Sequence, residues 1–271
     1  LTENIEEADV IIFNTCTVKS PTESAFFTRL DQVKKQFPHK AIIIAGCISQ
    51  TDPKKLKGYP LLGTKQIHRG VEIVEEVLHE NIVQMLETGE MPPLNLPRVR
   101  KNPAVYIIPI SRGCLGACTF CKTKVARGNL VSYPLENIKK EAETALAEGV
   151  KEIWLTSQDT GCYGFDLNSS INPNLNLAKL LKELVSLPQD FKIRIGMMNP
   201  NHLLKFKDEF LEVFSSPKIF KFVHLPLQSG DNQILKSMKR NYTVEEYKEL
   251  VKLIRTNFPE VTLATDIIVG F

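Results

Sequence analysis

Three cysteines lie on one short segment with the spacing Cys-x3-Cys-x2-Cys. They are Cys114, Cys118 and Cys121, and Gly113 and Gly116 allow the backbone to bend closely around a bound group. Thiolates are the usual ligands of iron–sulfur clusters, and cysteines on one loop can bind a single inorganic core. A four-iron cluster held by three sulfurs keeps one iron open to another ligand, as catalytic metal sites do. The segment therefore predicts a catalytic iron–sulfur cluster.

A structural zinc site is the main alternative for these cysteines. Such a site takes four ligands, commonly as two separated Cys-x2-Cys pairs. The only later cysteine is Cys162, so no second pair is available. We interpret Cys162 as a small residue in the Gly161-Cys-Tyr-Gly164 loop, and we favour the cluster interpretation.

The composition is typical of a folded protein in a reducing compartment. With 271 residues, 43% of them hydrophobic, the chain can form sizeable cores in one or two domains. No apolar run approaches the roughly 20 residues that span a bilayer, and no signal-peptide pattern is present. Six cysteines, three of them in one loop, do not indicate a disulfide framework. We expect a cytoplasmic monomer without membrane contact in these residues.

Positive charge gathers around the three cysteines, although the formal net charge is only +3. Between positions 91 and 135 there is no Asp or Glu, and Lys122, Lys124 and Arg127 follow the cysteines directly. A basic rim of this kind attracts polyanions, so we expect these three residues to contact RNA. For the basic stretch at 98–101, a linker without a partner is an equal alternative.

The first part of the chain alternates short apolar runs with helical patterns, which predicts an open α/β sheet. We expect Val10–Phe13 to be a buried parallel strand and Ala41–Ala45 to be the next strand. Helices are expected from Pro21 to about Phe37 and from Gly70 to His79. The periodicity of the second helix places Val71, Val74 and Leu78 on one face.

Two further cysteines follow the expected ends of these strands. Cys16 comes after the first strand and Cys47 after the second. In open α/β sheets ligands bind at the carboxyl edge of the strands, so the two cysteines could lie close together there. Two unrelated buried thiols are the alternative, because free cysteine is often a small core residue.

A segment with four prolines, at 87–103, separates this part from the rest. It predicts a linker at 91–103 between a domain at 1–90 and a second domain at 104–271. The second domain alternates strands and helices, which predicts a parallel sheet with right-handed crossovers, either open or as a partial (β/α) barrel.

The expected elements of the second domain place polar residues at one edge of its sheet. Strands are expected at 105–110, 152–156, 192–195, 220–224 and 262–267, and helices at 134–148, 175–187, 201–214, 231–238 and 243–257. Polar side chains gather at or after the carboxyl ends of these strands, which is the catalytic face of a barrel: Gln158, Asp159, Asn199, His224, Gln228 and Asp266.

Several motifs, in order, resemble the methylthiotransferase branch of the radical S-adenosylmethionine (SAM) enzymes. The cysteine loop continues as Cys121-Lys-Thr-Lys-Val-Ala-Arg-Gly128, which resembles that branch. Five further segments are similar. Three lie in the second domain: Trp154-Leu-Thr-Ser-Gln-Asp-Thr-Gly161, His224-Leu-Pro-Leu-Gln-Ser-Gly230 and Met238-Lys-Arg-Asn-Tyr-Thr243. Two lie in the first domain: Asn14-Thr-Cys-Thr17 and Ala45-Gly-Cys47. The resemblance extends over nearly the whole chain.

The resemblance implies two 4Fe–4S clusters and SAM as cofactors. The cluster on the three-cysteine loop would cleave SAM reductively, and the resulting 5′-deoxyadenosyl radical would activate C2 of an adenine. The second cluster, on Cys16, Cys47 and a cysteine upstream of Leu1, would deliver the methylated sulfur. Phe120 matches an aromatic position beside which the backbone meets adenine. The six polar strand-end residues are candidates for binding SAM and the base edge.

The implied reaction converts N6-threonylcarbamoyladenosine at position 37 of tRNA to its 2-methylthio derivative. The Lys122-Thr-Lys124 and Gly196-Met-Met-Asn-Pro200 segments are most similar to archaeal and eukaryotic enzymes with this substrate. The anticodon loop of tRNA would bind the basic rim, and Lys122 or Lys124 would meet the threonylcarbamoyl carboxylate. Alternatives are isopentenyladenosine in tRNA, a ribosomal-protein side chain, or a non-catalytic iron–sulfur scaffold. The sequence does not indicate the electron donor or the sulfur donor.

Relative to this family we expect a chain truncated at both ends. Family members carry an upstream strand with the first cysteine of the second cluster. They also continue into a C-terminal RNA-binding β-barrel, which we expect to be missing here.

Overall fold

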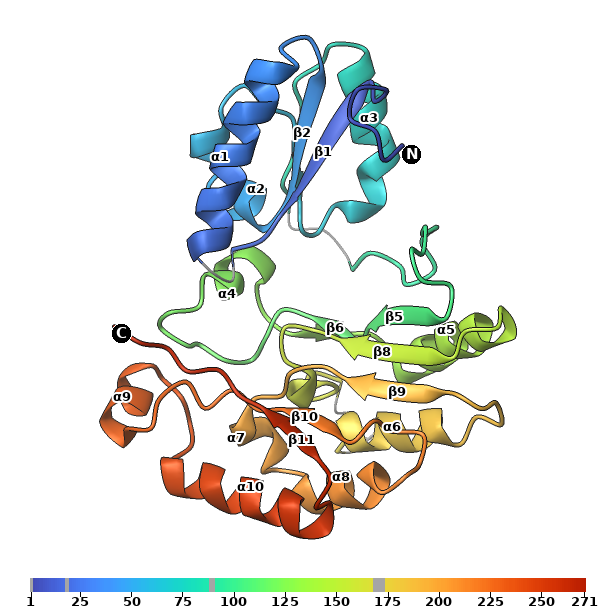
Figure 1. Ribbon diagram of the computed structural model, residues 1–271, viewed down its shortest axis with the longest axis vertical. Coiled ribbons are helices and arrows are strands. Elements are labelled where there is room, and N and C mark those ends of the chain that lie inside the picture. The colour runs from blue at the N-terminus through green and yellow to red at the C-terminus, as the bar shows by residue number, and fades with distance from the viewer. Residues whose placement is uncertain (1, 18–19, 88–90, 168–173) are drawn as a thin grey trace. The chain divides into compact units, whose positions relative to one another are not determined.

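The computed structural model describes residues 2–17, 20–87, 91–167 and 174–271, which form two compact units (Figure 1). Unit 1 comprises Leu1–Leu96 and Cys121–Gly128, and unit 2 comprises Pro97–Phe120 and Asn129–Phe271. Within the described ranges, no helix is both long enough and apolar enough to cross a membrane.

Unit 1 is a three-layer α/β structure built on a parallel sheet. Its strands are β1 (Val10–Thr15), β2 (Ala41–Gly46), β3 (Leu61–Gly63) and β4 (Gln84–Met85), in the order β1-β2-β3-β4. Figure 1 shows α1 (Ser20–Gln36) and α3 (Gly70–Leu78) on opposite faces of this sheet, with the short α2 (Cys47–Thr51) after β2. The strands and helices predicted here are confirmed.

The core of unit 1 follows from the alternation of side chains along β2. Ile42 and Ile44 pack against Phe26 and Leu30 of α1, whereas Ile43 faces the opposite layer and packs with Ile73. All three isoleucines are at least nine-tenths buried, because β2 lies inside the sheet and is covered on both faces.

Two details of the predicted packing in unit 1 are wrong. The Val10–Phe13 strand is not fully buried: Ile12 is 50% exposed, because β1 is the edge strand of the described sheet. The buried face of α3 is formed by Ile73 and Val77, while Val71 is 72% exposed. At about 100° per residue, Val71 lies roughly 200° around the helix from Ile73, so both cannot face the sheet.

Unit 1 also contains the short helix α4 (Lys122–Arg127), which follows the three cysteines. This helix packs on α2, and Thr64 Oγ1 donates a hydrogen bond to the carbonyl of Ala126 at 2.8 Å. Residues 121–128 group with unit 1 through these contacts, and the predicted domain over 104–271 stays a prediction.

Unit 2 has the predicted alternation of parallel strands and helices. The strands β5 (Val105–Pro109), β8 (Glu152–Thr156) and β9 (Lys192–Ile195) pair in that order. A parallel bridge from Ile193 to Ile219 continues toward β10 (Phe222–His224), which pairs with β11 (Thr262–Ala264). The strand order follows the chain order, as in a partial (β/α) barrel, so the predicted fold class is confirmed.

Helices cover the outside of this curved sheet (Figure 1). They are α5 (Leu135–Ala147), α6 (Leu177–Val185), α7 (Pro200–Leu203), α8 (Lys207–Phe214), α9 (Asn232–Ser237) and α10 (Val244–Asn257). Their starts have local causes: Asn176 and Asp231 accept N-cap hydrogen bonds, and Thr243 and Glu246 form a capping box.

Three expectations for unit 2 need correction. The helix predicted at 201–214 is two helices, because the chain turns at Phe206. Phe206 has φ of −139°, and its ring centre lies 6.2 Å from that of Phe165. The last predicted strand ends at Ala264 instead of Ile267. A short antiparallel pair, β6 (Ser111–Arg112) with β7 (Val131–Ser132), was not predicted.

Candidate functional site

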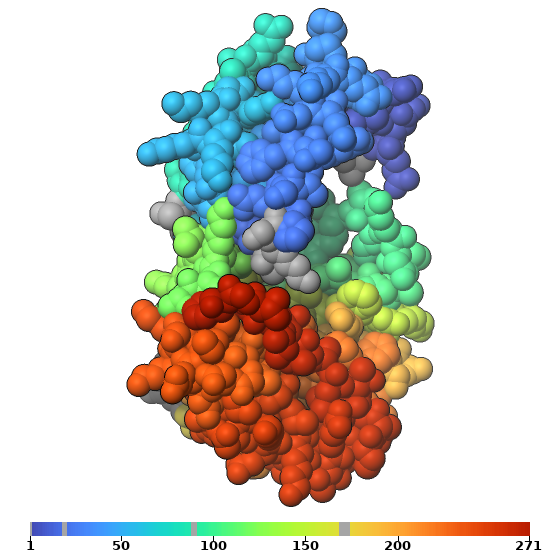
Figure 2. Space-filling view, turned by 60° about the vertical axis from the view of Figure 1, so that its left-hand side comes forward, coloured from blue at the N-terminus to red at the C-terminus, as the bar shows by residue number. Residues whose placement is uncertain are grey.

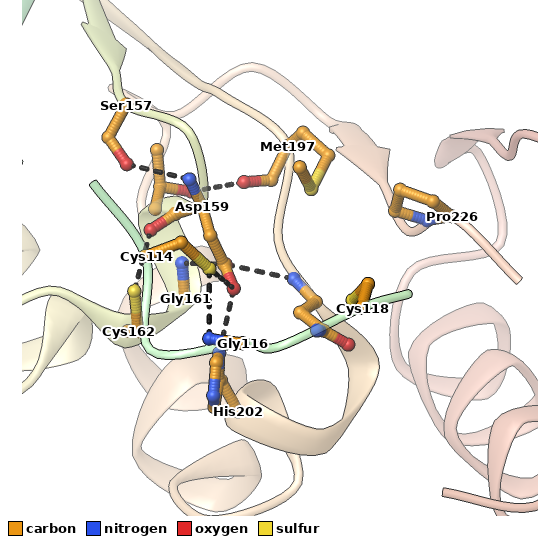
Figure 3. Close-up of polar contacts among 12 residues, drawn as sticks. Cys114, Gly116, Cys118, Ser157, Asp159, Gly161, Cys162, Met197, His202 and Pro226 are labelled. Atoms are coloured by element: carbon orange, nitrogen blue, oxygen red, sulfur yellow. Dashed lines mark hydrogen bonds and ion pairs between the residues drawn. The ribbon is translucent and has the colours of Figure 1, made fainter. Parts of the chain in front are cut away.

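The cysteine loop places two sulfurs around one glycine in unit 2. A Cβ atom built on Gly116 would lie 3.4 Å from Cys114 Sγ and 3.6 Å from Cys118 Sγ. The backbone N–H of Gly116 also donates to Cys114 Sγ at 3.2 Å (Figure 3). Gly113, with φ of +71°, turns the chain into the loop in a conformation that favours glycine. Cys121 is the N-cap residue of α4 and groups with unit 1.

Asp159 is the centre of a buried network beside this loop (Figure 3). Its Oδ1 accepts hydrogen bonds from the backbone N–H groups of Gly161 and Asn199, both at 3.0 Å. Its Oδ2 lies 2.7 Å from His202 Nδ1 and 3.9 Å from Cys114 Sγ. Asp159 is 1% exposed, so the partners of its carboxylate oxygens are these protein groups. Gly161, Asn199 and His202 thus contact the carboxylate in the structure, and the predicted contact of Asp159 with SAM stays a prediction.

Cys162 lies beside Cys114 of the cysteine loop. We predicted it only as a small residue of its own loop, so this contact was not expected. The Sγ atoms of Cys114 and Cys162 and a carboxylate oxygen of Asp159 lie within 4.8 Å of one another. The hydrogen bond with Cys162 lowers the pKa of Cys114 to about 7, and the N–H of Gly116 acts in the same direction. That hydrogen bond and burial raise the pKa of Cys162. Cys114 is thus the sulfur prepared to become a thiolate, the form that binds metals.

The other predicted residues on this side of the sheet differ in their roles. Gln158 Oε1 accepts a hydrogen bond from the backbone N–H of Gly113 at 2.6 Å, so its side chain fixes the start of the loop. Asn199 is 6% exposed, and its Oδ1 has no hydrogen-bond partner among the described residues. Asn199 and Cys118 line a cleft of about 630 Å³. Phe120 is half-buried.

His224, Gln228 and Asp266 come together at the ends of β10 and β11. His224 Nε2 lies 2.8 Å from Asp266 Oδ2, and the backbone N–H of Gln228 donates to the carbonyl of Asp266 at 2.8 Å. Gln228 has φ of +72°, an uncommon value for a residue other than glycine. The carbonyl of His224 accepts from Met198 N–H, so this group is joined to the segment before Asn199. The predicted clustering of these three residues at the strand ends is seen in the structure.

In unit 1, Cys16 and Cys47 directly follow paired residues of two parallel strands. Thr15 and Gly46 are register partners at the ends of β1 and β2. Thr15 Oγ1 joins these ends: it donates to the carbonyl of Ala45 at 2.7 Å and accepts from Ile48 N–H at 3.0 Å. Cys16 is exposed and Cys47 is buried, and both are free thiols. The predicted placement of both cysteines at one sheet edge is confirmed.

The residues predicted as a basic rim are partly neutralised by acids from distant segments. Lys122 Nζ lies 2.7 Å from carboxylate oxygens of both Glu23 and Asp52, within unit 1. These contacts lower the pKa of Asp52, chiefly through its hydrogen bond with Lys122. The stretch at 91–135 contains no acid in the sequence, but in the structure Lys122 lies beside two acids of other segments.

The basic stretch at 98–101 is also paired. In unit 2, Arg98 forms an ion pair with Glu141 at 2.8 Å and Arg100 with Glu148 at 2.9 Å, both on or beside α5. Tyr106 Oη lies 2.7 Å from the same carboxylate of Glu141, which fixes it further. These arginines hold the segment before β5 against a helix, which is a structural role.

Two residues near the loop were missed by sequence reasoning. His202 contacts Asp159, and Arg240 places Nη1 3.5 Å from Cys118 Sγ. Arg240 lies within the Met238-Lys-Arg-Asn-Tyr-Thr243 motif, which carried the resemblance without a role for any of its residues. For His202 the sequence held no comparable signal.

Comparison with known proteins supports both parts of the chain. Residues 108–271 match the family model described as the radical SAM superfamily, and residues 1–61 match the uncharacterized protein family UPF0004. The probable threonylcarbamoyladenosine tRNA methylthiotransferase of Pyrococcus horikoshii is 43% identical over 276 residues, covering 100% of this chain and 63% of that protein. The human threonylcarbamoyladenosine tRNA methylthiotransferase is 41% identical over 281 residues, covering 100% of this chain and 47% of that protein. The chain thus spans about half to two thirds of the length of these relatives.

Solved structures show the same fold at low identity. The radical S-adenosylmethionine methyltransferase TsrM of Kitasatospora setae has a TM-score of 0.65 at 14% identity, with 94% of this chain and 55% of that chain covered. The cobalamin-dependent S-adenosylmethionine radical enzyme OxsB has a TM-score of 0.63 at 15% identity, with 97% of this chain and 41% of that chain covered.

The residues of the loop fit the cluster that this superfamily uses with SAM. Cys114 has a lowered pKa, a backbone N–H already donates to its sulfur, and Cys118 shares the same glycine. The family match covers more than half of the sequence and begins just before the three cysteines. The chain belongs to the radical SAM superfamily.

Proposed function

We propose that the protein is a tRNA methylthiotransferase that converts N6-threonylcarbamoyladenosine at position 37 to its 2-methylthio derivative. The observation that carries this proposal is the presence of two cysteine sites on one chain. One is the radical SAM loop in unit 2, and the other is the pair Cys16 and Cys47 at the joined ends of β1 and β2. The relatives named for this reaction are similar over the whole chain.

The residues of unit 2 hold the reaction centre in this proposal. When bound to Cys114, Cys118 and Cys121, a 4Fe–4S cluster supplies the electron that cleaves SAM and so gives access to an unreactive aromatic C–H bond. Gln158 fixes the start of the loop, and Asp159 joins the backbone of Gly161 and Asn199 beside it. Asn199, His224, Gln228 and Asp266 remain candidates for binding SAM or the base edge, and Phe120 for the contact of its backbone with adenine.

The residues of unit 1 supply the sulfur site and part of the RNA contact. Cys16 and Cys47 would be two of the ligands of a second 4Fe–4S cluster. Lys124 and Arg127 on α4 would contact the substrate, with Lys124 meeting the threonylcarbamoyl carboxylate through a charge-assisted hydrogen bond. A base in an anticodon loop is already accessible, so it can enter the site at modest energetic cost. We expect the protein to act as a cytoplasmic monomer.

The proposal is tested by nucleoside mass spectrometry of tRNA from cells that lack the full-length protein and from cells in which it is restored. We expect the 2-methylthio derivative to be lost and regained while N6-threonylcarbamoyladenosine itself persists. Restoration with Cys47→Ala should not regain it. Unchanged tRNA together with a mass shift on a ribosomal protein would favour the protein-modifying alternative.

A further inference from the structure

The turn between α9 and α10 holds the cysteine loop at two adjacent residues of unit 2. Thr119 donates twice to it, from its backbone N–H to the carbonyl of Met238 at 3.2 Å and from Oγ1 to the carbonyl of Ser237 at 3.1 Å. One residue earlier, Cys118 Sγ lies 3.5 Å from Nη1 of Arg240. A segment some 120 residues later in the sequence thus contacts the loop at a cluster ligand and at the residue that follows it.

The guanidinium of Arg240 is held in place by three separate partners. Its Nε donates to Tyr242 Oη at 3.0 Å and its Nη2 to the carbonyl of Pro226 at 3.1 Å, while Nη1 points at Cys118 (Figure 3 labels Cys118 and Pro226). Its Cζ lies 5.1 Å from the centre of the Tyr242 ring, and Tyr242 Oη donates in turn to the carbonyl of Leu227 at 2.6 Å. These contacts hold the guanidinium in one orientation, with Nη1 directed at Cys118 Sγ.

Arg240 differs from Arg98 and Arg100 of unit 2 in its partners. Arg98 and Arg100 are paired with glutamates, but within the described ranges no carboxylate forms an ion pair with Arg240. The guanidinium remains charged at all relevant pH values. Its partner at Nη1 is a sulfur that becomes a thiolate when it ligates iron. The turn therefore aims a permanent positive charge and an N–H at one cluster ligand.

We propose that Arg240 is a positioning residue that sets the reduction potential of the cluster through its hydrogen bond to Cys118. Hydrogen bonds to the ligand sulfurs and nearby charge are among the factors that determine the potentials of iron–sulfur clusters. Reduction makes a cluster more negative, so a cation at this sulfur favours the reduced state. The inference rests on the proposed cluster, and it concerns the ease with which that cluster accepts an electron.

The surroundings of the turn provide a matched control. Lys239 precedes Arg240, is exposed, and lines the cleft of about 630 Å³ beside the loop. Helices α9 and α10 lie at the surface of unit 2, in its orange to red part in Figure 2. Lys239 carries the same charge but makes no hydrogen bond to the loop within the described residues. Comparing the two positions separates a specific hydrogen bond from the general field of a basic surface.

The experiment is a reductive titration of the full-length, anaerobically reconstituted protein, followed by electron paramagnetic resonance of the reduced cluster. It is carried out with Cys16→Ala and Cys47→Ala present, so that the signal comes from the loop in unit 2. We expect Arg240→Gln to bind the same amount of iron but to shift the reduction equilibrium about tenfold toward the oxidised state, which is about 59 mV for one electron. Arg240→Lys should shift it less, and Lys239→Gln should leave it unchanged.

Tyr242→Phe keeps the ring but removes the oxygen that holds Nε, so we expect a smaller shift in the same direction. An unchanged potential in an iron-loaded Arg240→Gln variant would overturn the proposal. Loss of iron from Arg240→Gln with an unchanged potential in Tyr242→Phe would overturn it as well, because Arg240 would then only support the fold. The titration requires no tRNA, so its outcome is independent of whether the proposed substrate is correct.

Discussion

Replacing Asp159 by alanine should destabilise unit 2 more than any other single change beside the cysteine loop. Its carboxylate is 1% exposed and accepts from two backbone N–H groups and from His202 Nδ1. Each buried donor left without an acceptor costs about 1–3 kcal/mol. Two backbone N–H groups lose their acceptor, so we expect a loss of about 2–6 kcal/mol in the free energy of unfolding. A typical domain has about 5–15 kcal/mol in total.

Trp154 makes this loss measurable in unit 2 alone. It is the only tryptophan of the chain and lies in β8, three residues before the loop that carries Asp159. Urea unfolding of the reduced protein is followed by Trp154 fluorescence at about pH 6, where Cys114, with a pKa of about 7, is mostly protonated. This pH limits the repulsion between Asp159 and a Cys114 thiolate in the native protein.

Asp159→Asn and Asp190→Ala provide the comparison. Asparagine keeps one oxygen for the two backbone donors but loses the charge, so we expect a cost of about 1–2 kcal/mol. Asp190 is exposed, and its replacement should change stability by less than about 0.5 kcal/mol. If Asp159→Ala is no less stable than Asp190→Ala, the buried network does not support the loop and the reasoning is refuted.

The remaining predictions concern unit 1. Lys122→Met should lower the stability of the α2 and α4 segments, followed by hydrogen exchange, by about 0.5–1 kcal/mol. Because Lys122 lowers the pKa of Asp52 in the folded protein, this contribution is present above the ordinary value of 3.8 and is lost as the pH falls through the lowered pKa, so wild type and variant should converge in acid. Gly46→Ala should lower the melting temperature more than Gly58→Ala: both have positive φ, but only at Gly46 would a Cβ lie 2.5 Å from a carbonyl oxygen, and equal melting temperatures would contradict this. Lys124→Ala should reduce turnover on threonylcarbamoyl tRNA more than binding of unmodified tRNA, and an equal effect on both would assign it to phosphate.

Local patterns were sufficient to predict most elements. The strands at 152–156 and 192–195 were predicted with the bounds that the structure shows, since the first contains a short apolar run and the second alternates charged residues with isoleucine. The same logic placed Cys16 and Cys47 after two strands, and parallel pairing then brings strand ends to one edge. The helix at 201–214 was predicted as continuous because its periodicity does not reveal the turn at Phe206, which depends on packing against Phe165.

The contacts around the site could not be predicted, because their partners are far apart in the sequence. Lys122 meets Glu23 across 99 residues, and Arg240 meets Cys118 across 122 residues. The sequence shows that Lys122 and Arg240 are cationic, but their roles depend on the groups that the fold places beside them. Asp159 was recognised as a strand-end polar residue, but the sequence did not reveal its burial or its hydrogen bonds from Gly161 and Asn199.

The central claim is that the loop with three cysteines binds a cluster that cleaves SAM. The most direct test measures 5′-deoxyadenosine formed from SAM by the reduced, anaerobically reconstituted full-length protein. We expect the wild type to form it. The triple variant Cys114→Ala, Cys118→Ala and Cys121→Ala should form none and should lack the corresponding iron, about four atoms per protein. Undiminished formation of 5′-deoxyadenosine by the triple variant would contradict the account.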